Sequence, residues 1–116
     1  MSSLPLAYIG YMDGTSCHTR HIASAAWVIY TPESELFHSG GAFLSTATNN
    51  IAEYMSVISL LTEASSRDIS NLVVMLDSQL VVMQLKNHYH VRNPILLLHY
   101  LRVRLLERQF EFITYE

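Results

Sequence analysis

The stretch 49–77, NNIAEYMSVISLLTEASSRDISNLVVMLD, holds the two elements that decide the fold. Residues 49–65 follow a helical repeat, with Thr48 or Asn49 as the N-cap. Residues 72–77 are a continuous apolar run of strand length, which is typical of a strand buried on both faces of a sheet. A helix followed by a buried strand predicts an α/β fold with helices packed on a sheet.

Three strands are expected before this stretch. Residues 6–13, 22–30 and 36–44 are rich in β-branched, aromatic and small residues, and the loops between them are short. The segment Thr31-Pro32-Glu33-Ser34 has the composition of a turn. Short connections favour pairing between successive strands, so the first three strands are predicted to form an antiparallel meander.

Two helices and a last strand are expected after the stretch. Ser78 can cap a helix that runs to about Leu85. Asn93-Pro94 opens a second helix that runs to about Arg108, and residues 110–115 alternate as a strand. The order β-β-β-α-β-α-α-β predicts one α/β domain over residues 1–116. Its mixed five-stranded sheet would join the three-strand antiparallel meander to parallel strands, with helices packed on it.

Bulk composition narrows the class of protein. The chain has 116 residues, half of them hydrophobic, and no apolar run of the roughly 18 residues that a membrane span needs, so no membrane partner is expected. A single cysteine and no signal-peptide pattern favour an intracellular protein, in the cytoplasm or the nucleus. A net charge of −3 counts against strong non-specific binding of nucleic acid.

Glu53 is the most informative single residue. On a helical wheel it falls among apolar residues, between Leu60 and Ala64, whereas the polar face is predicted to hold Ser56, Ser59 and Glu63. The carboxylate should therefore point towards the sheet. A buried charge needs a partner, and a cation is one. The alternative, of equal weight on helical geometry, is a side chain that reaches solvent or helps to cap a helix.

Two further carboxylates favour the cation. Asp13 ends the first strand and Asp77 ends the buried strand. If these strands are neighbours in the sheet, both side chains converge beyond its edge, and Glu53 points at them from the helix. Three carboxylates in one place repel one another unless a divalent cation neutralises them. Oxygen ligands favour Mg²⁺ or Mn²⁺ over zinc.

Three motifs give the chain a family resemblance. They are Asp13-Gly14-Thr15-Ser16 after the first strand, TNNIAEY at 48–54, and LDSQLV at 76–81. In this order and on these elements, they resemble the ribonuclease H type 1 family over nearly the whole chain. The segment QLKNHYHVRNP at 84–94 is similar to the short reverse-transcriptase-like branch found in plants, archaea and some bacteria.

The resemblance implies an activity and its residues. Asp13, Glu53 and Asp77 would hold two Mg²⁺ or Mn²⁺ ions about 4 Å apart, one activating water and one stabilising the leaving 3′-oxygen. The domain would hydrolyse the RNA strand of an RNA/DNA hybrid to a 5′-phosphate and a 3′-hydroxyl. The implied minor-groove contacts are Asn49, Asn50 and Gln79. Gly14, Thr15 and Ser16 would lie near the RNA sugar. Lys86 and Arg92 would contact phosphates, and the equally weighted alternative is that their side chains are only solvated.

The sequence also departs from the family pattern. The family's last helix, with a fourth carboxylate, does not follow the strand that ends at Tyr115. We therefore expect a domain that lacks the C-terminal helix, with weak or no nuclease activity. Its uncovered sheet face could support a dimer. The chain would be a truncated piece of an active enzyme, a part of a larger polyprotein, or a retroelement remnant.

Other functions are considered beside the nuclease. The main alternative is a non-catalytic ribonuclease H-like tether or interaction module of a retroelement. Another nuclease or an integrase on the same fold is disfavoured by the TNNIAEY and LDSQLV motifs. Cys17, His18 and His21 could bind zinc, but three ligands in one loop make a weak site.

Overall fold

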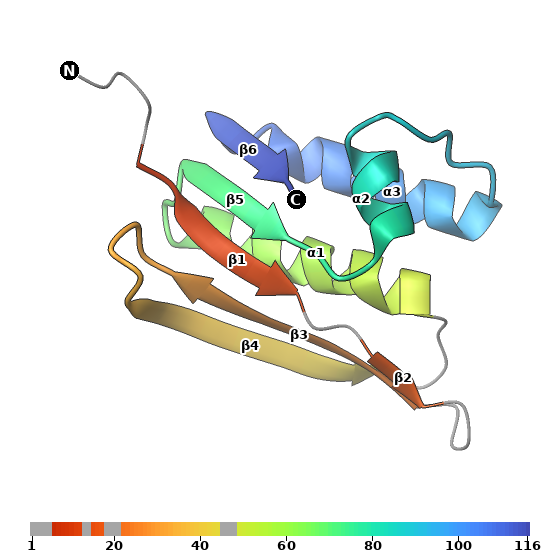
Figure 1. The fold of residues 1–116 in the computed structure, drawn as a ribbon, viewed down its shortest axis with the longest axis horizontal. Helices are drawn as coiled ribbons and strands as arrows, with labels where there is room; N and C mark the ends of the chain where they lie inside the picture. Colours follow the sequence, from red (N-terminus) through yellow and green to blue (C-terminus); the bar gives the residue numbers. More distant parts are fainter. Residues whose placement is uncertain (1–5, 13–14, 18–21, 45–48) are drawn as a thin grey trace.

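A computed structural model describes residues 6–12, 15–17, 22–44 and 49–116. Figure 1 shows the elements, which are β1 (Tyr8–Met12), β2 (Thr15–Cys17), β3 (Ile22–Tyr30), β4 (Leu36–Leu44), α1 (Asn49–Ser66), β5 (Asn71–Met75), α2 (Gln79–Leu85), α3 (Pro94–Glu107) and β6 (Phe112–Tyr115). Every predicted helix and strand is present.

The sheet is mixed, as the sequence predicts. β3 pairs antiparallel with β4 along one edge and with β1 and β2 along successive stretches of the other. β1 pairs parallel with β5, and β5 pairs parallel with β6. Because β1 and β2 share one edge of β3, the sheet is five strands wide. The antiparallel meander joined to parallel strands is therefore confirmed.

The predicted strand 72–77 ends earlier than expected. Hydrogen bonds between β5 and the chain end continue to Leu76, whose amide donates to the Glu116 carbonyl over 2.8 Å. The Asp77 amide instead donates to the side chain of Glu53. The strand stops because a carboxylate from α1 takes the next backbone donor.

α1 packs directly on one face of the sheet. Gly10 in β1 lies under Leu60, and a Cβ built at Gly10 would come within 2.6 Å of Leu60 Cδ2. The absence of a side chain at Gly10 therefore lets helix and strand approach closely. The other side of α1 packs against α3.

The predicted polar face of α1 is partly wrong. Ser56 is fully buried, and its hydroxyl donates to the Ala52 carbonyl over 3.0 Å. Ser59 accepts a 2.8 Å hydrogen bond from the Trp27 indole in β3. The helix is covered both by the sheet and by α3, so small hydroxyl residues occupy positions that a helix packed on one side would expose to water.

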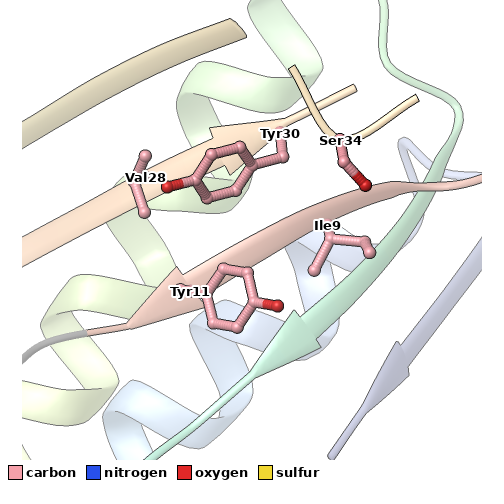
Figure 2. A pocket seen from close by; sticks show the side chains of 5 residues that line it. All are labelled: Ile9, Tyr11, Val28, Tyr30 and Ser34. Carbon is pink, nitrogen blue, oxygen red and sulfur yellow. The ribbon is translucent and has the colours of Figure 1, made fainter. Parts of the chain in front are cut away.

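The opposite face of the sheet is open among the described residues. Ile9, Tyr11, Val28 and Tyr30 alternate with the residues that face α1, and Figure 2 shows their side chains together on this face. With Ser34 they line a hollow of about 360 Å³, and Tyr11 and Tyr30 meet edge to face at 5.8 Å. Tyr11 is 44% exposed on this face, and the expectation that a C-terminal helix would otherwise cover it stays a prediction.

α3 begins at Pro94, with Asn93 as its cap, in agreement with the sequence. It buries Leu96 and Val103 against the rest of the domain. Leu98, Leu101 and Leu105 are largely exposed on its outer side. Within the described part of the chain, no helix has the length and apolar character needed to cross a membrane.

Candidate active site

The site lies where β1 and β5 end. These strands are parallel neighbours, and Tyr11 is paired with Met75, so their carboxyl ends reach the same edge of the sheet. The predicted convergence of Asp13 and Asp77 requires the strands that precede them to be neighbours, and β1 and β5 are neighbours. Asp77 is exposed just past β5, whereas Asp13 lies outside the described residues. The convergence of the two aspartates therefore stays a prediction.

Glu53 is buried at this edge, with only 1% of its surface exposed. Its Oε2 accepts hydrogen bonds from the Asp77 amide at 2.9 Å and from the Ser78 amide at 2.7 Å. The expectation that Glu53 points towards the sheet is met, and the alternative that it reaches solvent is wrong. The alternative that it helps to cap its own helix stays a prediction, since the two amides lie before α2 and not at the start of α1.

The two amides explain how an acidic side chain is tolerated inside the domain. Hydrogen bonds to an ionised acceptor are stronger than neutral ones and offset part of the cost of burying the charge. They also bind α1 to the turn between β5 and α2. The carboxylate is therefore held in one position beside Asp77.

The donor set suits a hard divalent cation. Glu53 and Asp77 offer carboxylate oxygens at one edge of the sheet, which is the chemistry that Mg²⁺ and Mn²⁺ prefer. Within the described residues, no group of three or more His, Cys, Asp or Glu side chains lies close enough to hold a metal ion. A three-carboxylate site depends on Asp13, which is not among them.

The predicted minor-groove residues gather at the starts of two helices. Asn49 is the first residue of α1 and is exposed, and Gln79 is the first residue of α2 and is exposed. Asn50 is half-buried, and its Oδ1 accepts a 2.8 Å hydrogen bond from the Ser78 hydroxyl. This bond brings the start of α1 to the start of α2.

Ser78 makes one contact that the sequence predicted and one that it did not. Its predicted role as the N-cap of α2 is confirmed, since its Oγ accepts from the Val81 amide at 3.3 Å. The contact with Asn50 was not predicted. Its only sequence signal was a serine directly after the acid that ends a buried strand, and nothing local shows that a distant helix start lies beside it.

The remaining predicted residues are less closely placed. Thr15 and Ser16 lie in β2, opposite Ser24 and Ala23, and their side chains are not described. Gly14, like His18, His21 and the N-cap candidate Thr48, lies outside the described residues, so the zinc alternative remains an expectation.

Lys86 and Arg92 do not join the carboxylates. Lys86 is the C-cap of α2, and the rise of that helix carries the chain about 12 Å from Ser78. It lines a separate hollow of about 390 Å³ with His88, Arg104 and Glu107. Arg92 is exposed just before α3.

A partly buried polar network was also not predicted. Arg104 pairs with Glu107 and stacks over Tyr100, and the Tyr115 hydroxyl donates to Glu107 over 2.6 Å. Burial and the Glu107 carboxylate raise the pKa of Tyr115, which therefore stays protonated as a donor. The network fastens α3 to β6, and we assign it a structural role.

Comparison with known proteins agrees with this geometry. The sequence model of a family described as reverse transcriptase-like matches residues 11–116. The bifunctional protein Rv2228c of Mycobacterium tuberculosis is 33% identical over 105 residues, which cover 90% of this chain and 29% of that protein. Ribonuclease HI of Halobacterium salinarum is 32% identical over 101 residues, 87% of this chain and 51% of the relative. The chain thus spans about half or less of these relatives.

Solved structures give the same result. The crystal structure of ribonuclease H1 from H. salinarum superposes with a TM-score of 0.89 at 29% identity, covering 95% of this chain and 83% of that one. The N-terminal ribonuclease H domain of Rv2228c gives 0.90 at 30% identity, covering 97% and 81%. A third structure, LC11-RNase H1 in complex with an RNA/DNA hybrid, gives 0.87 at 23% identity and supports the fold alone. The chain therefore belongs to the ribonuclease H family, in its reverse transcriptase-like group.

Proposed function

We propose that this domain hydrolyses the RNA strand of RNA/DNA hybrids with the help of Mg²⁺ or Mn²⁺. The observation that carries the proposal is Glu53, a buried carboxylate anchored to the backbone of Asp77 and Ser78 at the carboxyl end of β5. The relatives named ribonuclease H support the substrate class.

The chain's own residues divide the work. Asp13, Glu53 and Asp77 would hold the divalent ions, which would supply positive charge and an activated water when bound. The amides of Asp77 and Ser78 keep the Glu53 carboxylate oriented. Asn49, Asn50 and Gln79 donate to or accept from the minor groove of the hybrid, where base edges and 2′-hydroxyls are accessible. Lys86 and Arg92 contact phosphates further along the duplex.

The test is cleavage of an end-labelled RNA/DNA hybrid with and without Mg²⁺. Asp77→Asn and Glu53→Gln should reduce cleavage to background, because each removes a negative ligand while keeping the side chain's size. Glu111→Gln is the matched control, since it removes one exposed carboxylate at the start of β6. If the parent cleaves above background and Glu53→Gln cleaves at the same rate, the proposal is contradicted.

We also propose that residues 1–116 assayed by themselves cleave slowly or not at all. The resemblance implies a fourth carboxylate beyond Asp13, Glu53 and Asp77, and an ion held by fewer ligands binds less tightly. A version extended along its natural reading frame by a helix with an Asp should then cleave faster. Equal rates for the two proteins would show that three carboxylates suffice.

A second candidate function is a non-catalytic interaction module, favoured by the open face of Ile9, Tyr11, Val28 and Tyr30. In this case the apolar face pairs with a second copy and buries its aromatic side chains. Sedimentation equilibrium should then show a dimer that Tyr11→Lys converts to a monomer. A monomeric parent protein at high concentration excludes this dimer.

A further inference from the structure

The Ser78 hydroxyl makes two bonds of opposite sense. It accepts from the Val81 amide as the cap of α2, and it donates to Oδ1 of Asn50 at 2.8 Å. A hydroxyl has only one proton to donate. Ser78 donates that proton to the carbonyl oxygen of the Asn50 side-chain amide. The amide oxygen therefore faces Ser78, and the NH₂ group points away from Ser78.

Ser78 is itself held firmly. Its backbone amide donates to the buried Glu53 carboxylate at 2.7 Å, and its backbone is extended, as a helix cap requires. The Asn50 amide is half-buried, and its NH₂ group makes no hydrogen bond that the structure records with another described residue. The orientation of the Asn50 amide is thus set by bonds that span α1, β5 and α2.

We propose that Ser78 is a positioning residue that holds the NH₂ group of Asn50 outward, so that Asn50 meets the nucleic acid as a hydrogen-bond donor. This inference rests on the proposed contact between Asn50 and the hybrid. It adds the polarity of the contact and the residue that sets it.

The polarity has a chemical consequence. The minor groove presents acceptors at both A·T and T·A pairs, and G·C pairs add a donor. An outward NH₂ group can bond to these acceptors, or to a 2′-hydroxyl oxygen, at most positions along a hybrid. An outward carbonyl would find donors only at guanine and at 2′-hydroxyls. The Ser78–Asn50 pair therefore favours contact with little dependence on base sequence.

Four variants separate positioning from capping. Ser78→Thr keeps the cap and the donor, while Ser78→Ala removes both. Ser78→Asp keeps a good cap but can only accept from Asn50, so it turns the NH₂ group inward and the oxygen outward. Asn50→Ala removes the contact altogether. Leu80→Glu, at an exposed position two residues further on, is the control for the added negative charge.

The first readout needs no substrate. Proton NMR should show the Asn50 side-chain NH₂ exchanging freely with water in the parent protein and in Ser78→Thr. In Ser78→Asp one of its protons should be protected. Unchanged exchange in Ser78→Asp would show that Ser78 does not set the amide, whatever the protein binds.

The second readout is hybrid affinity by fluorescence anisotropy, with Asp77→Asn present in every protein to prevent cleavage. We expect Ser78→Thr to bind within about twofold of the parent, and Ser78→Asp and Asn50→Ala about five- to tenfold more weakly, the value of one hydrogen bond. Ser78→Asp should melt no lower than Ser78→Ala.

The outcomes distinguish this inference from the proposed function. If Ser78 acts only as a cap, Ser78→Asp will bind like the parent while Asn50→Ala binds weakly, and the positioning role is overturned. If Asn50→Ala binds like the parent, the proposed substrate contact itself is wrong, and the inference falls with it. If Leu80→Glu weakens binding as much as Ser78→Asp, charge and not polarity explains the loss.

Discussion

Helices α1 and α3 are both rich in apolar residues, yet they are buried to very different extents. Half of the 18 residues of α1 are buried, including Glu53 and Ser56. Of the 14 residues of α3, only Leu96 and Val103 are buried, and Leu98 is 65% exposed. The helix that carries polar groups inward is covered on two sides, and the helix that carries leucines outward is covered on one.

The difference shows that apolar residues do not by themselves fix which face of a helix is buried. α1 packs against both the sheet and α3, so more of its surface is covered than that of α3. The Glu53 carboxylate is tolerated in this buried position because two backbone amides donate hydrogen bonds to it. α3 lies at the rim, where its outer leucines cost little since exposed apolar atoms are common on protein surfaces.

The largest expected effect is in the interior of α1. Leu60→Ala should lower the free energy of unfolding by about 2–5 kcal/mol, because Leu60 is fully buried against Gly10 and the change leaves a cavity. Leu105→Ala makes the same chemical change at a 60% exposed position of α3 and is the matched control. Urea unfolding measures both. Similar losses in the two variants would remove the contrast between the helices.

The next effect tests the anchored carboxylate. Glu53→Ala should destabilise the domain by about 1–3 kcal/mol, because the amides of Asp77 and Ser78 lose their acceptor inside the protein. Glu53→Gln keeps an acceptor oxygen and should cost less, although it removes the charge. If Glu53→Ala is more stable than the parent, repulsion among the acidic side chains dominates over the hydrogen bonds.

A smaller effect is expected at the start of α3. Asn93 Oδ1 accepts from the amides of Ile95 and Leu96, so Asn93→Ala should cost about 1 kcal/mol. Asn93→Ser retains a capping oxygen and should therefore keep most of the stability that Asn93→Ala loses. Thermal unfolding with circular dichroism detects the difference. No loss in Asn93→Ala would mean that the contacts of α3 with α1, α2 and β6 hold the helix without its cap.

The smallest effect is expected on the outer side of α3. Leu98→Glu should change the free energy of unfolding by less than about 0.5 kcal/mol, since the new charge stays in water. Leu96→Glu, two residues away, buries a charge and should prevent folding or lower the melting temperature strongly. A large loss in Leu98→Glu would show that the outer leucines are covered in solution.

Much of the fold could be predicted because local patterns agree with it. The apolar run at 72–77, the cap residues Ser78 and Asn93, and the change from strand to helix at Asn49 identified the elements and their order. The wrong prediction of an exposed Ser56 arose because a helical wheel assumes one covered side. The boundary of β5 differed because the Asp77 amide bonds to a side chain from another element.

The sequence by itself determined the class of the fold, the family, and the unusual place of Glu53 on an apolar helix face. The fold class and the place of Glu53 follow from periodicity, which depends only on neighbours along the chain, and the family follows from the resemblance of three motifs. Only the tertiary structure decided what Glu53 meets, that Ser78 holds Asn50, and that Lys86 lies away from the carboxylates. The hydrogen bonds join residues that are 24 to 28 positions apart in the sequence. Lys86 and Ser78 are kept apart because they lie at opposite ends of α2. Their geometry exists only after the sheet has brought the ends of its strands together.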